Sequence, residues 1–160
     1  MITNKPSIVG DKDTDNIRAA IEHRATWFCL MIEAAKKRGI DTSFAREAVF
    51  KCGCFHGENK YPRTDDIRTF AAAFANENVV KVFEMDVKTT DQALDIEFHY
   101  CPLVEAWRKL GVADDDMPEL CDIAMDGDRG IVSKYDDFEF KLGKTIAQGN
   151  KVCEINIRKK

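Results

Sequence analysis

The sequence predicts an α+β fold, in which N-terminal helices pack on a four-stranded antiparallel sheet with a helical crossover between two hairpins. Three observations predict it. Apolar residues recur at helical spacing through the first half of the chain. The spacing then changes to the alternation typical of strands. Two short helical stretches separate the two alternating regions, an order of elements that is typical of the α+β class.

The first half is expected to consist of a loose arm, residues 1–13, followed by a helical region, residues 14–76. Thr14 can cap the first helix and Gly39 can end it. The run from Cys52 to Gly57 contains two glycines and is expected to break the second helix. The predicted helices span residues 14–38, 42–51 and 64–74.

The second half, residues 77–160, is expected to form the sheet and to carry the cysteine motifs. Lys88, Thr89, Thr90 and Asp91 suit a hairpin turn, and the second hairpin turns at residues 148–151. The predicted strands span residues 79–87, 94–100, 138–142 and 153–157, and the predicted crossover helices span residues 102–110 and 117–125. Residues 1–160 are therefore expected to form a single domain.

Composition limits the classes of partner. The 160 residues are 44% hydrophobic and 32% charged, with a net charge of −4. This acidic balance argues against nucleic acid or an anionic membrane as partner. No apolar run approaches the roughly 18–20 residues that cross a bilayer, and no secretory signal is visible. We expect a cytoplasmic protein with reduced cysteines that acts on a small molecule, and we leave assembly into a homo-oligomer open.

Cys101 is the most informative residue of the sequence. It precedes Pro102, which suits the first position of a helix, so Cys101 is expected at the N-cap. A thiol at that position faces unpaired N–H groups and the positive end of the helix dipole, which favours its thiolate. Cys101 is therefore a candidate nucleophile or metal ligand. The alternative is a small buried side chain at the end of a strand.

His99 lies two residues before Cys101 in an extended segment, so the two side chains are expected on one face. A Cys–His pair held in this way could serve as nucleophile and base. The alternative is an exposed strand edge with an incidental histidine. Both interpretations stay open at this point.

Cys121 and Cys153 each lie at core-like positions of their elements. Together with Cys101 they could form a three-thiolate zinc site, although they lack the closely spaced C-x-x-C pairs of common zinc sites. The three thiols converge only if the end of the sheet curls or if the crossover helices fold over it. No metal is the first expectation, and zinc on these three cysteines is the alternative.

Two further groups of residues carry side chains suited to a site. Asp128 follows a predicted helix end and could supply a carboxylate to a pocket, but Asp and Gly are also expected in turns. Cys52, Cys54 and His56 invite a metal interpretation, but a fourth ligand is not evident.

The second half of the chain resembles the L-2-amino-thiazoline-4-carboxylic acid hydrolase family. The resemblance covers about the last 85 residues and is looser around His23 and Arg24. It rests on the following positions: Cys101-Pro102, Trp107, Leu110-Gly111, Leu120-Cys121, Asp128, Phe140, Thr145-Ile146-Ala147, Gly149 and Cys153.

The resemblance implies a hydrolase that acts on the C–N bond of a cyclic amidine. Water adds at C2 of a thiazoline, and the ring opens to a carbamoyl-cysteine. In this hypothesis Cys101 attacks C2, Asp128 holds the amidinium and His99 transfers protons. Cys121, Cys153 and Thr145 are expected to line the pocket. In a second version, zinc on the thiolates activates water.

A different class of function also fits the pattern. Helices over an antiparallel sheet with clustered cysteines also resemble 4-vinyl-reductase-type ligand-binding domains. Under that interpretation the protein is a non-catalytic small-molecule-binding or sensor-like domain, and its cysteines are structural.

Overall fold

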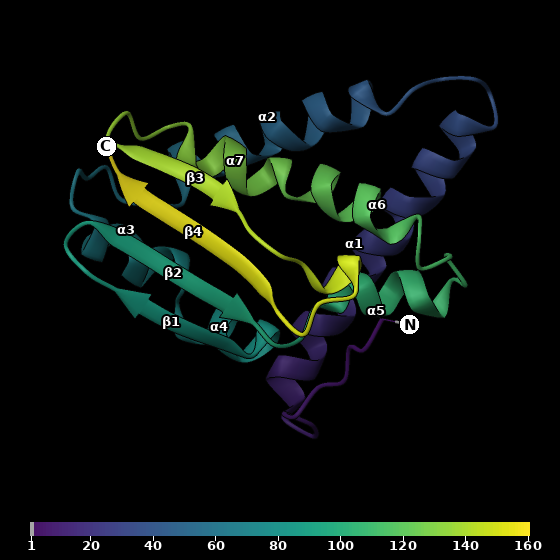
Figure 1. Ribbon diagram of the computed structural model, residues 1–160, viewed down its shortest axis with the longest axis horizontal. Helices are drawn as coiled ribbons and strands as arrows, with labels where there is room; N and C mark the ends of the chain where they lie inside the picture. The colour runs from purple at the N-terminus through teal and green to yellow at the C-terminus, as the bar shows by residue number, and fades with distance from the viewer. Residues whose placement is uncertain (1) are drawn as a thin grey trace.

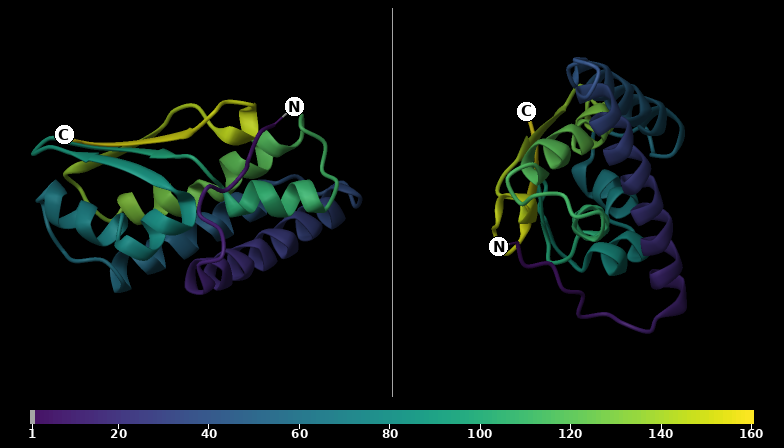
Figure 2. Two further views of the ribbon diagram at one scale, coloured as in Figure 1. Left: turned by 90° about the horizontal axis from the view of Figure 1, so that it is seen from below. Right: turned by 90° about the vertical axis from the view of Figure 1, so that its right-hand side faces the viewer.

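The computed structural model describes residues 2–160 and shows a single antiparallel sheet with a layer of helices against one face. Figure 1 shows the sheet from its outer face, and Figure 2 shows the helices gathered on the opposite side. The strand order is β1-β2-β4-β3, so the two hairpins meet at β2 and β4. The predicted α+β architecture is confirmed.

The elements before the first hairpin are helices: α1 (Lys12–Lys36), α2 (Ser43–Asn59), α3 (Ile67–Phe74) and α4 (Glu77–Phe83). The strands are β1 (Met85–Thr89), β2 (Ala93–Phe98), β3 (Phe138–Leu142) and β4 (Cys153–Lys159). The crossover holds α5 (Pro102–Lys109), α6 (Met117–Ala124) and α7 (Asp126–Val132), and a 3-10 turn η1 (Ile146–Gln148) joins β3 to β4.

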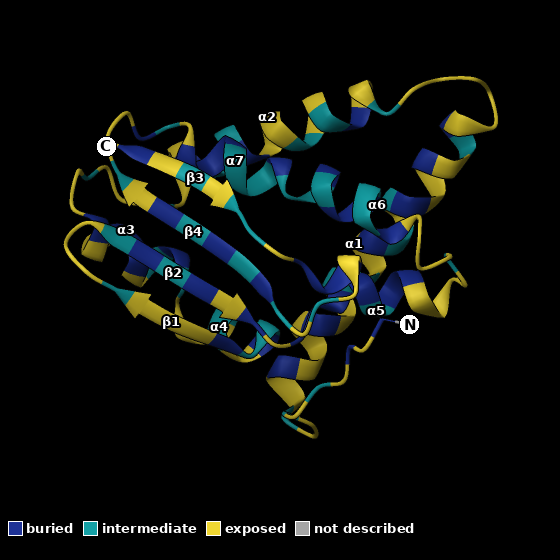
Figure 3. Ribbon diagram, viewed as in Figure 1, coloured by how far each residue is buried: buried dark blue, intermediate teal, exposed yellow. Residues whose placement is uncertain are grey.

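The inner face of the sheet forms the core, as the alternation predicted. Ile96 in β2 lies opposite Val87 in β1 and Ile155 in β4. Buried and exposed residues alternate along β2 and β4 (Figure 3). Trp107 of α5 is fully buried against α1, and its indole nitrogen donates to the carbonyl of Ala25 in that helix at 3.2 Å. The aromatic ring therefore adds a large apolar surface to the core while its polar atom stays satisfied.

The strand predicted over residues 79–87 is wrong in its first part. Residues Glu77–Phe83 form α4, whose N-cap Asn76 accepts a hydrogen bond from the amide of Val79 at 3.3 Å. Glu84 then adopts a left-handed conformation with φ 52°, and β1 begins only at Met85. The valines favour strands in isolation, but burial of Val82 against the core outweighs this preference.

The predicted helix break at residues 52–57 is also wrong, because α2 continues to Asn59. The glycines in this run serve close helix packing instead of a turn. A Cβ atom at Gly53 would overlap the carbonyl oxygen of Gly127 in α7, and one at Gly130 would overlap that of Phe50. The absence of side chains at these positions lets the two helix backbones approach each other.

The N-terminal arm is held against the domain and is not loose. Ile2 and Asn4 are buried, and the Glu84 carboxylate accepts hydrogen bonds from the backbone amides of Ser7 and Ile8. The first helix is capped by Asp11, whose carboxylate accepts from two amides of the first turn. Thr14, the predicted cap, is buried inside that turn.

Across residues 2–160, none of the helices combines the length and the apolar character that crossing a bilayer requires.

Candidate functional site

Cys101 occupies the predicted N-cap of α5, with Pro102 at the first helical position. Its side chain is 7% exposed and makes no capping hydrogen bond. Burial raises the pKa of the Cys101 thiol, and the nearby backbone N–H groups of Val104 and Leu103 offset only part of that effect. The helix therefore begins where the sequence predicts. The expected thiolate is not favoured, because the cost of burying its charge outweighs the stabilisation that the helix N-terminus provides.

Asn4 of the N-terminal arm covers this helix start. Its side-chain nitrogen donates to the carbonyl of Cys101 at 3.0 Å, and its side-chain oxygen accepts from the Cys101 amide at 2.9 Å. Asn4 is 2% exposed. Its role was not visible in the sequence, because a lone asparagine in a polar segment carries no periodic or motif signal.

Cys121 of α6 and Cys153 of β4 lie close enough to Cys101 for a charge on Cys101 to raise both of their pKa values. Burial is the larger cause for each, and it raises the pKa of Cys121 to about 12. The Cys153 sulfur accepts a hydrogen bond from the amide of Ile146 at 3.2 Å. The three thiols therefore lie near one another. Residues 143–152, which precede Cys153, pass over the crossover helices (Figure 1).

Thr145 belongs to the same group. It is buried, caps η1 through a hydrogen bond from the Gln148 amide, and its hydroxyl acts to lower the pKa of Cys121. We call Cys101, Cys121, Cys153 and Thr145 the thiol cluster. Four of the six predicted site residues are thus brought together.

The three sulfurs do not converge tightly enough to share one metal ion as they stand. Across residues 2–160, the groups of three possible ligand atoms within 4.8 Å of one another do not include the thiol cluster. Zinc on these cysteines would require their side chains to move.

His99 lies apart from the thiol cluster. It is exposed, and its Nε2 forms a hydrogen bond with the Asp86 carboxylate at 2.9 Å. Strand β2 ends at Phe98, so His99 and Cys101 do not share a strand face as the spacing had suggested. Within residues 2–160, no hydrogen bond joins the imidazole to Cys101.

Asp128 lies on α7, half-buried in the helical layer. Burial raises its pKa to about 7, although the charges of Arg24 and Arg129 act in the opposite direction. The pKa of Tyr61 is raised to about 12, chiefly by burial of Tyr61 and to a smaller extent by the charge of Asp128. A carboxyl group that titrates near neutral pH is suited to general acid–base chemistry.

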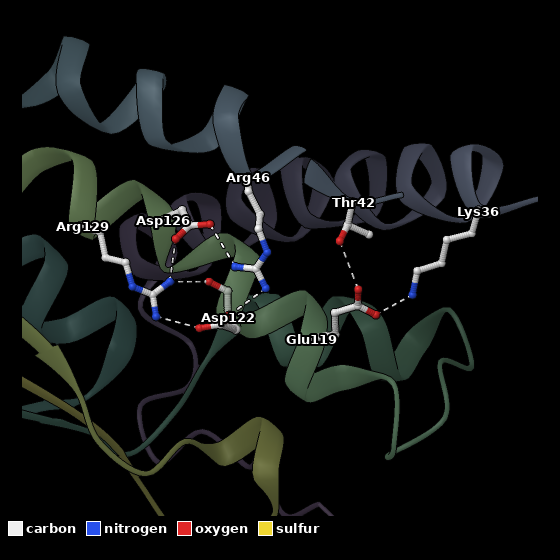
Figure 4. Close-up of polar contacts among 7 residues, drawn as sticks. All are labelled: Lys36, Thr42, Arg46, Glu119, Asp122, Asp126 and Arg129. Carbon is white, nitrogen blue, oxygen red and sulfur yellow. Dashed lines mark hydrogen bonds and ion pairs between the residues drawn. The ribbon is translucent and has the colours of Figure 1, made fainter. Parts of the chain in front are cut away.

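A network of ion pairs fixes α6 and α7, which carry Cys121 and Asp128, against α2 (Figure 4). Asp122 binds Arg46 at 2.7 Å and Arg129 at 2.6 Å, and Asp126 binds the same two arginines at 3.1 and 2.6 Å. Glu119 joins α6 to the end of α1 through Lys36 and to Thr42 (Figure 4). The pairs that Arg46 and Lys36 form could not be predicted from the sequence, since their partners lie 76–83 residues away. Arg129, in contrast, pairs with acids three and seven residues before it.

The chain is thus an α+β protein with a thiol cluster where its sheet meets its crossover helices. It belongs to the L-2-amino-thiazoline-4-carboxylic acid hydrolase family, whose model matches residues 18–157. The match includes the predicted site residues, from His99 to Cys153.

Solved structures show a related fold. The chain is similar to the crystal structure of a trafficking protein particle complex subunit 3 from Naegleria fowleri covalently bound to palmitic acid. The TM-score is 0.58 at 14% identity, covering 87% of this chain and 94% of that chain, and the likeness concerns the fold alone. No curated protein sequence matches the chain.

Proposed function

We propose that this protein hydrolyses a C–N bond of a cyclic amidine, of the 2-amino-thiazoline-carboxylate type. The observation that carries the proposal is the family match over residues 18–157, which spans the whole of the thiol cluster. Hydrolysis of an amidine needs a nucleophile and a proton donor, and the site residues supply both kinds of group.

Cys101 is the proposed nucleophile. Its sulfur bonds to C2 of the protonated ring and the thiol proton passes to the ring nitrogen. The ring C–N bond then breaks, and this nitrogen leaves as an amine. Water then adds to the same carbon and the bond to Cys101 breaks, which returns the thiol and releases an S-carbamoyl product. The backbone N–H groups of Leu103 and Val104 support the thiolate while it forms.

Asp128 is the proposed acid for this reaction. Its raised pKa keeps part of the population protonated near pH 7. The hypothesis that His99 transfers protons has weaker support, because this imidazole is bound to Asp86 on the exposed face. Cys101 is covered by the arm, so substrate access requires Asn4 to separate from the start of α5.

The direct test is turnover of L-2-amino-thiazoline-4-carboxylate, followed by mass spectrometry of the product. We expect Cys101→Ser to abolish turnover, whereas Cys52→Ser, at an exposed cysteine of α2, should retain it. Full activity of Cys101→Ser would exclude the covalent mechanism. Absence of turnover by the unmodified protein would exclude this substrate.

A non-catalytic binding protein is the second candidate function. It is favoured by the burial of Cys101, Cys121 and Cys153, which raises the pKa of each thiol and so favours the neutral form. The protein of similar fold is described as covalently bound to palmitic acid. Native mass spectrometry of protein purified without denaturant distinguishes the two: a retained small molecule together with no turnover supports this candidate.

A further inference from the structure

We propose that Asp86, Glu97 and His99 form a binding site for one divalent transition-metal ion on the exposed face of the sheet. One carboxylate oxygen from each acid and one ring nitrogen of His99 all lie within 4.8 Å of one another. Within residues 2–160, this is the group of three ligand side chains that meets this condition. The site is distinct from the thiol cluster and from Asp128.

The backbone places these three side chains on one surface. Asp86 of β1 lies directly opposite Glu97 of β2 in the antiparallel pair. His99 follows Glu97 by two residues, and its amide donates to the carbonyl of Glu84 at 3.2 Å, which continues the pairing past the end of the strand. Side chains two residues apart in an extended segment point to the same side. Ligands held on paired strands are restrained in position before the ion binds.

Charge along this part of the sheet is unbalanced. Glu97 lies opposite Asp86 on one side and opposite Glu154 of β4 on the other. Like charges that face each other across strands destabilise a sheet. His99 provides the ion pair to Asp86, and among the described residues Glu97 has no basic partner. A bound cation would relieve this repulsion.

Residues that lie opposite one another across β1, β2 and β4 form a row on the sheet face. The next row, which contains Asp95, shows that the excess of negative charge is local. Asp95 lies opposite Lys88 of β1, and its carboxylate binds Arg158 of β4 at 2.6 Å. Asp95 is therefore ion-paired to a basic residue of β4 and lies opposite another basic residue in β1. The row that contains Glu97 differs in having acids at all three strand positions.

A hollow of about 290 Å³ adjoins the site, and Asp86 and His99 line it together with Ser7 and Ile8 of the N-terminal arm. It provides room for water molecules to complete the coordination of an ion. An imidazole with two carboxylates suits zinc and its first-row neighbours, whereas calcium and magnesium prefer oxygen ligands alone. Because all three ligands are exposed, we expect reversible binding at micromolar metal.

The experiment must separate this site from the six cysteines, because thiolates are also zinc ligands in proteins. The chain contains three histidines, His23, His56 and His99, so their ring resonances can be followed individually by NMR. Zn²⁺ is titrated into the full-length protein. We expect the His99 signals to shift or broaden first, with a stoichiometry of one, while those of His23 stay unchanged.

Three variants test the assignment of ligands. Glu97→Gln preserves shape and should weaken Zn²⁺ binding at least about tenfold, and His99→Ala should remove it. Asp95→Asn removes one acid from the next row of the same face and should leave the affinity unchanged. Replacing Zn²⁺ by Mg²⁺ should give no shift of His99 at the same concentrations.

Specific results would overturn the proposal. One is a His99 signal that does not change below about 1 mM Zn²⁺. Another is an earlier shift of His56, which would place the ion on α2 beside Cys52 and Cys54. A third is equal weakening by Glu97→Gln and Asp95→Asn, which would show only general attraction of cations to an acidic surface.

Discussion

Asn4 and the backbone of Cys101 are joined by two reciprocal hydrogen bonds, of 3.0 and 2.9 Å, across 97 positions of sequence. The contact ties the N-terminal arm to the start of α5 and covers the thiol cluster. Asn4 and Cys101 are both buried, so water does not replace these hydrogen bonds when they are lost.

Asn4→Ala should therefore destabilise the protein and uncover Cys101. Loss of the two bonds leaves the buried Cys101 N–H unpaired, while the Cys101 carbonyl keeps its bond from the Glu105 amide. We expect a cost of about 1–3 kcal/mol in the free energy of unfolding. Urea unfolding measures the stability, and iodoacetamide labelling measures the access to Cys101. The control is Asn59→Ala, at an exposed residue of α2. Equal labelling of Cys101 in both variants would show that the arm does not control access.

Thiol labelling should separate the exposed cysteine from the buried ones. Cys52 is exposed and should react readily at pH 8, whereas Cys101, Cys121 and Cys153 should react slowly because burial raises their pKa values. Peptide mass spectrometry after labelling between pH 6 and about 10 gives the site-specific rates. Fast labelling of Cys101 near neutral pH would instead indicate an activated thiolate.

The same thiols predict a loss of stability at alkaline pH. Their folded pKa values lie above the unfolded value of 9.0, so the folded state favours the protonated form. This contribution is fully present below pH 9 and is lost as the pH rises toward the folded pKa of Cys121, about 12. Thermal unfolding of the protein and of Cys121→Ala across pH 8–10 measures this loss of stability. The melting temperature of the variant should fall less steeply with pH.

Asp128 should make stability depend on pH in the neutral range. Its pKa rises from 3.8 to about 7 on folding, so the folded state binds the proton more tightly. Stability should fall as the pH rises from about 4 to 7. Asp128→Asn should remove that slope and be the more stable protein above pH 7, by on the order of 1–3 kcal/mol.

Activity provides an independent check on Asp128. If Asp128 is the acid, the pH profile of kcat should show a group with a pKa near 7 that Asp128→Asn lacks. Asp126→Asn, within the ion-pair network of the same helix, is the matched control and should keep this group in its profile. A profile unchanged by Asp128→Asn would remove Asp128 from the proposed mechanism.

Packing between α2 and α7 should respond differently to three glycine substitutions. Gly53→Ala and Gly130→Ala would each place a methyl group against a carbonyl oxygen of the opposite helix. The helices would have to separate, at a cost of about 1–3 kcal/mol or more. Gly127→Ala is the control, because its Cβ would meet only a Val49 methyl at 3.6 Å. Urea unfolding of the three variants measures the difference.

The sequence by itself determined the order of elements in most of this protein. The change from helical to alternating spacing identified the four strands of the sheet and the crossover between them, and the Cys101-Pro102 pair identified the start of α5. These features are local: they depend on the spacing of side chains along one element and on the conformational preference of one proline.

Tertiary structure decided the environment of each site residue. The burial that raises the pKa of Cys101 comes from distant segments, including the arm that carries Asn4. His99 was separated from Cys101 because the strand ended at Phe98, two residues before its predicted end, and because the His99 imidazole met Asp86. Such contacts depend on residues far apart in the chain, and no local spacing encodes which of them will meet.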